Sequence, residues 1–168
     1  MTSNSAGALQ SAFPAVTYRG EVASKWIDAN DHMDSIHYKT VANLATGVMF
    51  RAAGIDPDYR EATGTTFFQA EMHICYEREL RHNECFYVRS WLLEVDARRI
   101  RHFHEVFRAS DDARAATVEL MTLHVNRQTR KTAAMPTSIL SRLESMADDC
   151  AGPPPPKNIG RRISMTRE

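Results

Sequence analysis

The sequence predicts an α+β domain in which one long helix packs on one face of a strongly curved antiparallel β-sheet. A length of 168 residues fits a single domain. Apolar residues recur at steps of three and four over residues 35–53, which is the period of a helix. After residue 64, four long segments rich in Val, Ile, Phe and Tyr alternate between apolar and polar side chains, as strands do. One strand, one helix and then four strands place the helix against the sheet.

Each element has its own local signals. Residues 15–27 alternate imperfectly and predict a first strand that stops at a polar cluster over 28–34. The helix has Asp34 or Ser35 as a possible N-cap and Gly54 as its stop. A short polar connection precedes the later strands, which we expect over 65–80, 85–95, 99–110 and 113–128.

The domain is expected to span residues 14–150. Residues 1–13 are small and polar, and we expect them to be disordered. A second, amphipathic helix is expected over 137–149, after Pro136. Residues 151–168 read as a tail that begins with a run of four prolines and becomes basic.

Composition excludes several classes of protein. No apolar run of 18 residues exists, so no transmembrane helix is expected. The first residues lack the pattern of a signal peptide, which favours a cytoplasmic protein. The 3 cysteines show no CxxC spacing, so neither a disulfide framework nor a structural zinc site is predicted.

The charges cancel overall but are unevenly distributed. Residues 1–97 hold 8 basic and 13 acidic side chains, and residues 98–168 hold 13 and 8. The neutral sum disfavours nucleic acid as a partner. Of the 21 basic residues 17 are arginines, which suit a phosphorylated ligand, although surface ion pairs explain the same composition equally well.

Residues 26–46, WIDANDHMDSIHYKTVANLAT, resemble the signature of acyl-CoA thioesterases related to 4-hydroxybenzoyl-CoA thioesterase. In that signature a strand ends in Asp, a polar turn follows, and a Tyr lies within the helix; here these are Asp28 and Tyr38. Residues 71–76, 96–100 and 123–126 are similar to later strands of the subgroup that includes betainyl-CoA thioesterase-like proteins. The resemblance implies the hot-dog fold, acyl-CoA hydrolysis without a cofactor, and a homodimer or dimer of dimers with active sites at the subunit interface.

Asp28 is the residue that the resemblance implies for the chemistry. A carboxylate there acts either as a general base on water or as a nucleophile, and the sequence does not separate the two. It could also be only a cap at the end of a strand. The chain has Asp31 where the subgroup usually has Gly, and Asp34 where it usually has Asn. Adjacent negative charges predict a raised pKa for Asp28.

The start of the helix is expected to polarise the thioester carbonyl. The backbone amides of Ser35 and Ile36, with the positive end of the helix dipole, are the donors that this requires. They would be occupied if the Asp34 side chain capped them.

The remaining site residues come from both halves of the chain. Glu71 resembles a residue of the subgroup and is a candidate for the pocket, because in some hot-dog thioesterases a Glu of the partner subunit does the carboxylate's work. Its alternative is an outward-facing strand residue. The predicted substrate-binding residues are His32, Met33 and Tyr38 near the turn, and Arg99, Arg130 and Lys131 for the CoA phosphates.

Histidines and aromatic residues allow further interpretations. His102 and His104 have the spacing of metal ligands on one strand face, but two ligands do not make a site, and no metal is predicted. The aromatic residues are expected chiefly in the core, with a subset able to cage a quaternary ammonium group: Trp26, Phe67, Phe68, Tyr76 and Trp91.

The sequence also allows two alternative functions. One is a hot-dog enoyl-CoA hydratase or dehydratase, which would pair an Asp with His32 or His37. The other is a non-catalytic acyl-CoA-binding module, which the additional charges of Asp31 and Asp34 favour.

Overall fold

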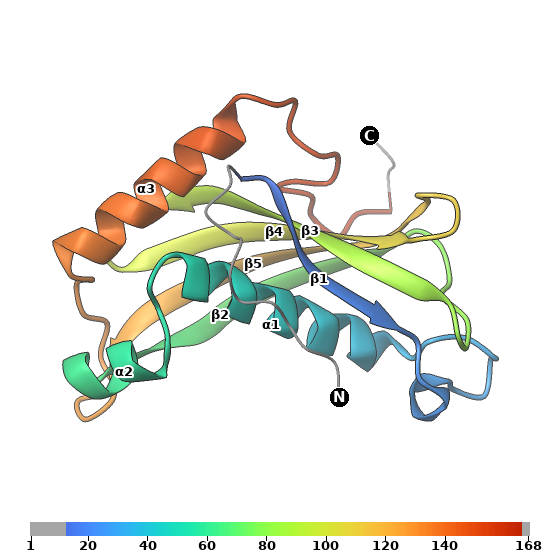
Figure 1. Cartoon of the computed structure of the whole chain (residues 1–168), viewed down its shortest axis with the longest axis horizontal. Coiled ribbons are helices and arrows are strands. Elements are labelled where there is room, and N and C mark those ends of the chain that lie inside the picture. The colour runs from blue at the N-terminus through green and yellow to red at the C-terminus, as the bar shows by residue number, and fades with distance from the viewer. Residues whose placement is uncertain (1–12, 166–168) are drawn as a thin grey trace.

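The protein is described by a computed structural model that covers residues 13–165 (Figure 1). Within these residues five strands form one antiparallel sheet in the order β1-β3-β4-β5-β2. The predicted α+β class is confirmed. The strands are β1 (Ala15–Glu21), β2 (Thr65–Tyr76), β3 (Cys85–Val95), β4 (Arg99–Arg108) and β5 (Arg114–Asn126).

The helix α1 (Ser35–Ala52) lies along one face of this sheet, which curves around it (Figure 1). Irregularities in the strand register, such as those between Gln69 and Glu71 and between Leu92 and Glu94, help to bend the sheet. The position of α1 along the curved sheet confirms the predicted helix and the hot-dog arrangement. The side chains that α1 buries are Tyr38, Val41, Ala42, Ala45, Thr46, Met49 and Phe50.

The first strand is shorter than predicted. It ends at Glu21, and residues Ser24–Trp26 form the single 3₁₀ turn η1 instead of continuing the strand. The reason is the lack of a partner, because β3 begins at Cys85, directly opposite Glu21.

A short helix, α2 (Pro57–Thr63), occupies the segment that the sequence indicates only as a short polar connection. Asp56 caps it by accepting a hydrogen bond from the Tyr59 amide at 2.8 Å. Pro57 begins the helix and Gly64 ends it with φ at 63°. These end signals are present in the sequence, but seven residues are too few to show a helical period.

The helix α3 (Thr137–Ala151) covers the edge of β3 beyond the start of β1. It buries apolar side chains that include Leu143 and Met146, and the Leu92 amide donates to the Cys150 sulfur at 3.3 Å. An exposed strand edge is a site of unwanted pairing, and α3 protects this one.

The packed chain reaches beyond both predicted boundaries of the domain. Phe13 is buried in the same apolar cluster as α3, so the packed chain includes it, while residues 1–12 lie outside the described range. At the other end, residues of the predicted tail contact the sheet, since the Gly160 amide donates to Glu119 at 2.7 Å. No helix within residues 13–165 is long and apolar enough to span a membrane.

Candidate functional site

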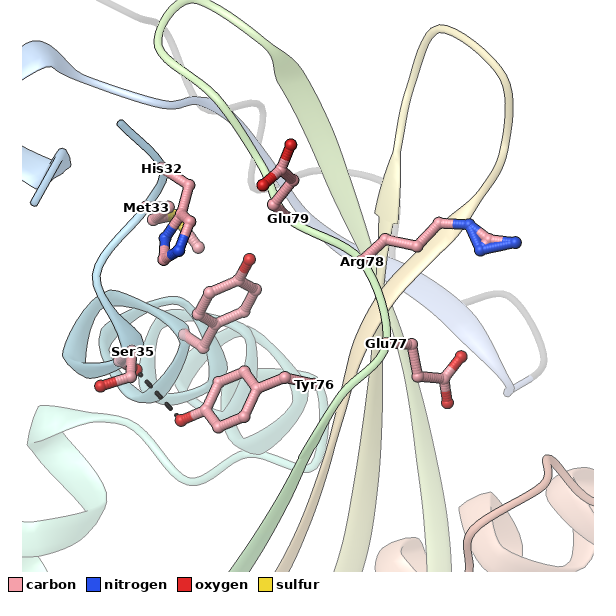
Figure 2. Close-up of a pocket in the computed structure, with 8 residues that line it drawn as sticks. His32, Met33, Ser35, Tyr76, Glu77, Arg78 and Glu79 are labelled. Carbon is pink, nitrogen blue, oxygen red and sulfur yellow. Dashed lines mark hydrogen bonds between the residues drawn. The ribbon is translucent and has the colours of Figure 1, made fainter. Parts of the chain in front are cut away.

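A pocket of about 380 Å³ lies where the N-terminus of α1 meets the end of β2 (Figure 2). The turn before α1, the first turns of the helix and the segment that follows β2 each supply part of its lining. The structure therefore brings together four of the predicted site residues. The lining consists of His32, Met33, Ser35, Tyr38, Tyr76, Glu77, Arg78 and Glu79.

The polar turn before α1 is closed by its own backbone and is joined to the segment after β2. The Asp28 amide donates to the His32 carbonyl at 3.0 Å, and the Met33 amide donates to the Leu80 carbonyl at 2.7 Å. Asp31 has φ at 61°, a left-handed conformation that Gly, Asn and Asp tolerate best. The turn thus accepts Asp31 in place of the usual glycine and sets Asp28 beside His32.

The Asp28 carboxylate is held ionised by the same turn. Its Oδ1 accepts the Asn30 amide at 2.8 Å, its Oδ2 accepts the Asn30 side chain at 3.2 Å, and its Oδ1 lies 3.7 Å from His32 Nδ1. The hydrogen bond from the Asn30 backbone, above all, lowers the pKa of Asp28 below its ordinary value. The expectation that Asp31 and Asp34 raise this pKa is wrong, because hydrogen bonds to the charged form dominate.

Asn30 is a site residue that sequence reasoning missed. An Asp followed two residues later by Asn is a recognisable local signal, because such turns close through a side-chain bond to a backbone amide. Asn30 orients the carboxylate of Asp28 without itself lining the pocket.

The start of α1 offers one free backbone donor rather than two. Asp34 caps the helix, and its Oδ1 accepts the Ile36 amide at 2.9 Å and the Ser35 hydroxyl at 3.3 Å. The expectation that the Ile36 amide is available is therefore wrong. The Ser35 amide has no hydrogen-bond partner within residues 13–165, and it sits at the positive end of the helix dipole.

Two tyrosines form an aromatic wall of the pocket. The Tyr38 and Tyr76 ring centroids are 5.3 Å apart and the ring planes are inclined at 78°. Burial raises the pKa of Tyr38 to about 12, so this phenol stays neutral. Tyr76 is 54% exposed, so it is not one of the core members of the aromatic set, and its hydroxyl donates to the Ser35 carbonyl at 3.5 Å.

The other predicted site residues do not line this pocket within one protomer. Glu71 is exposed, and it lies on the sheet face opposite α1, since its neighbour Met72 packs towards the helix. Three cationic side chains lie near the end of the sheet where β2 begins, whereas the pocket lies where β2 ends. They are Arg99, which pairs with Asp96 at 2.6 Å, Arg130, which lies over the Phe68 ring at 4.6 Å, and the exposed Lys131.

The His102 and His104 pair ties α1 to the sheet. Both are fully buried; His104 bonds Thr46 of α1 at 2.8 Å and Ser90 at 2.7 Å, while His102 bonds Thr122 at 3.1 Å. Burial lowers the pKa of His102 to about 3 and that of His104 well below its ordinary value, so both are neutral. Residues 13–165 contain no group of three or more side chains able to hold a metal ion.

Residues 22–143 match the Thioesterase-like superfamily, a range that includes the turn, α1 and strands β2 to β5. The chain belongs to this superfamily. This thioesterase is 29% identical over 149 residues to a betainyl-CoA thioesterase from Pseudomonas aeruginosa, covering 89% of this chain and 94% of that one. It is 32% identical to an L-carnitine dehydrogenase/betainyl-CoA thioesterase from Agrobacterium fabrum, covering 89% of this chain and 30% of that longer protein.

The fold of the thioesterase is also found among solved structures. A hypothetical protein from Staphylococcus aureus in complex with CoA superposes with a TM-score of 0.84 at 24% identity. The match covers 93% of this chain and 99% of that chain. Family and relatives together make this chain a thioester hydrolase of the acyl-CoA thioesterase type.

Proposed function

We propose that this thioesterase hydrolyses a small acyl-CoA to the free acid and CoA at the pocket between α1 and the end of β2. The observation that carries the proposal is the ionised Asp28 carboxylate, held by Asn30 in the turn that leads to the free Ser35 amide. His32 extends from this carboxylate to the pocket. The turn thus offers a base and an oxyanion donor at one end of one helix.

In the general-base form of the reaction, Asp28 takes a proton from water while the water oxygen bonds to the thioester carbon. The Ser35 amide donates to the carbonyl oxygen as it becomes negative. The carbon–sulfur bond then breaks, the CoA sulfur leaves as a thiolate, and the proton held by Asp28 passes to that thiolate, which restores the carboxylate. In the nucleophilic form, an Asp28 oxygen displaces the thiolate and forms an anhydride, which water hydrolyses to restore the carboxylate.

The acyl group that we propose first is betainyl, because relatives over most of this chain bear that name. The pocket supports a cationic acyl group through the rings of Tyr38 and Tyr76 and the carboxylate of Glu79. Aromatic faces attract a quaternary ammonium by about 0.5–2 kcal/mol.

We expect betainyl-CoA to be hydrolysed with a kcat/KM about tenfold higher than 3,3-dimethylbutyryl-CoA, its uncharged isostere. The two acyl groups differ in charge but hardly in shape, so the ratio isolates the electrostatic contribution. Free thiol release measures both rates. Equal rates would contradict the cationic specificity, and hydration of an enoyl-CoA without thiol release would replace hydrolysis with the hydratase alternative.

We also propose that the protein is a homodimer that pairs through β2. Among the described strands β2 has only β5 as a neighbour, and α1 exposes Ile36 and Leu44 on its open side. Antiparallel pairing of two β2 edges about a two-fold axis sets the Thr65 end of one strand beside the Tyr76 end of the other. Arg130 and Lys131 of one protomer then approach the partner's pocket, where CoA phosphates need cations.

Light scattering is expected to report a mass that is a multiple of the 19.0 kDa chain, with a dimer as the smallest active species. Replacing Ala70, which lies at the register irregularity in the centre of β2, with proline puts a residue that has no amide donor into this edge strand, and it should shift the mass towards the monomer. A native mass of one chain with full activity would contradict the dimer.

A further inference from the structure

The chain that follows α3 turns back over the sheet (Figure 1). We call residues 157–160 the C-terminal strap. The Asn158 side chain donates to Glu77 Oε1 at 2.7 Å, and the Gly160 amide donates to Glu119 Oε2 at 2.7 Å. Glu119 lies between Val118 and Leu120, which pack towards α1, so the strap lies on the sheet face opposite the helix. Asn158 has φ at 82°, a left-handed value that Asn tolerates.

The Glu77 carboxylate joins the strap to the core of the sheet. Arg114 Nη2 donates to Glu77 Oε1 at 2.8 Å and its Nε donates to Oε2 at 3.1 Å. The remaining Nη1 of Arg114 donates at 2.9 Å to Glu105, which is 5% exposed and also accepts from the Trp91 indole at 3.0 Å. Asn158 therefore adds a donor from a distant part of the chain to a carboxylate that is already anchored.

Glu77 connects this network to the pocket on the other side of the sheet. Its side chain points away from the neighbouring Tyr76 ring, while its backbone belongs to the pocket wall (Figure 2). The amides of Glu77 and Arg78 both donate to the Ala115 carbonyl, at 2.8 and 3.0 Å. At the far end of the wall, the Leu80 carbonyl accepts the Met33 amide from the catalytic turn. The wall, residues 76–80, is thus held at one end by the turn and at the other by Glu77.

We propose that Asn158 is a positioning residue for this pocket wall. Through its hydrogen bond to Glu77, Asn158 fixes the positions of Tyr76 and Glu79 relative to the acyl group. Asn158 itself does not contact the substrate. The role in substrate binding rests on the proposed function, whereas the mechanical connection between strap and wall does not.

Two substitutions test the connection. Asn158→Gly deletes the amide and retains a backbone that adopts φ near 82°. Asn158→Asp retains the size but turns a donor into a carboxylate that faces Glu77. Lys157→Ala is the matched control, because its side chain is exposed and the Lys157 carbonyl that accepts from Arg114 is retained.

Amide hydrogen exchange of residues 76–80 and the KM and kcat for the best acyl-CoA substrate are the readouts. For Asn158→Gly we expect exchange and KM to rise about three- to tenfold with kcat within about twofold of wild type. Asn158→Asp should raise the exchange rates and KM more than Asn158→Gly does. Lys157→Ala should leave both the exchange rates and KM unchanged.

Wild-type exchange and KM in both Asn158 variants would overturn the proposal, as would a lower Tm with unchanged exchange and KM. If the wild-type protein released no thiol from any acyl-CoA, the proposed function would fail. The exchange rates of residues 76–80 would then still decide whether the strap holds the wall.

Discussion

Asp28→Asn is expected to lower kcat for thiol release by about 10³-fold, because the amide can neither take a proton from water nor attack the thioester. The substitution preserves the shape of the side chain and an oxygen able to accept the Asn30 amide. Stopped thiol-release assays at saturating acyl-CoA measure the loss. KM should change much less, because the substitution leaves the side chains that line the pocket unchanged.

Asp31→Asn is the matched control for this loss. Asn tolerates the left-handed backbone at φ 61°, and the variant removes one negative charge from the same turn. Its kcat should stay within about threefold of wild type. Equal loss in the two variants would mean that the turn, and not the Asp28 carboxylate, was damaged, and equal activity of Asp28→Asn and wild type would remove Asp28 from the mechanism.

Acidification is expected to unfold the protein through the buried His102 and His104. In the unfolded chain each histidine binds a proton near pH 6.5, but burial lowers the folded pKa of His102 to about 3 and that of His104 well below its ordinary value. Between pH 6.5 and the lowered pKa values of the folded state, the unfolded state binds more protons than the folded state. The free energy of unfolding therefore falls as the pH falls. Each histidine that stays neutral in the folded state lowers the free energy of unfolding by about 1.4 kcal/mol per pH unit below 6.5.

Urea unfolding between pH 7.5 and 5 measures this slope above the range in which most carboxylates titrate. The two sites together predict a loss on the order of 4 kcal/mol by pH 5, a large part of the stability of an ordinary domain. His82→Gln, at an exposed position, should leave the slope unchanged. A free energy of unfolding that is flat from pH 6.5 to 5 would contradict the assignment of a neutral buried pair.

The helix over residues 35–52 shows what local pattern predicts well. Its apolar period, its Asp34 cap and its Gly54 stop are all properties of neighbouring residues, and the structure has each of them. The short helix α2 was not predicted, because capping residues alone do not identify a segment of seven residues as a helix. The first strand was predicted too long because a strand ends where its partner strand ends. The partner strand begins at Cys85, which is 64 positions away from Glu21 in the sequence.

The electrostatics of the turn show where local reasoning fails. Counting charges near Asp28 predicted a raised pKa, but the direction depends on which groups donate hydrogen bonds to the carboxylate. The Asn30 amide donates to this carboxylate across two residues of the turn, a contact that a count of charges leaves out. Likewise, one of the two expected helix amides is free and the other is capped, which depends on the rotamer of Asp34.

By itself, the sequence determined the fold class and the long helix and marked the polar turn over residues 28–34, because these follow from periodicity and short-range spacing. Tertiary structure alone decided which side chains share the pocket. It separated Arg99, Arg130 and Lys131 from the pocket by the length of the sheet, and it joined Asn158 to Glu77 across 81 positions of chain. Such pairings depend on which strands lie side by side and which face each residue occupies, and no short stretch of residues carries that information.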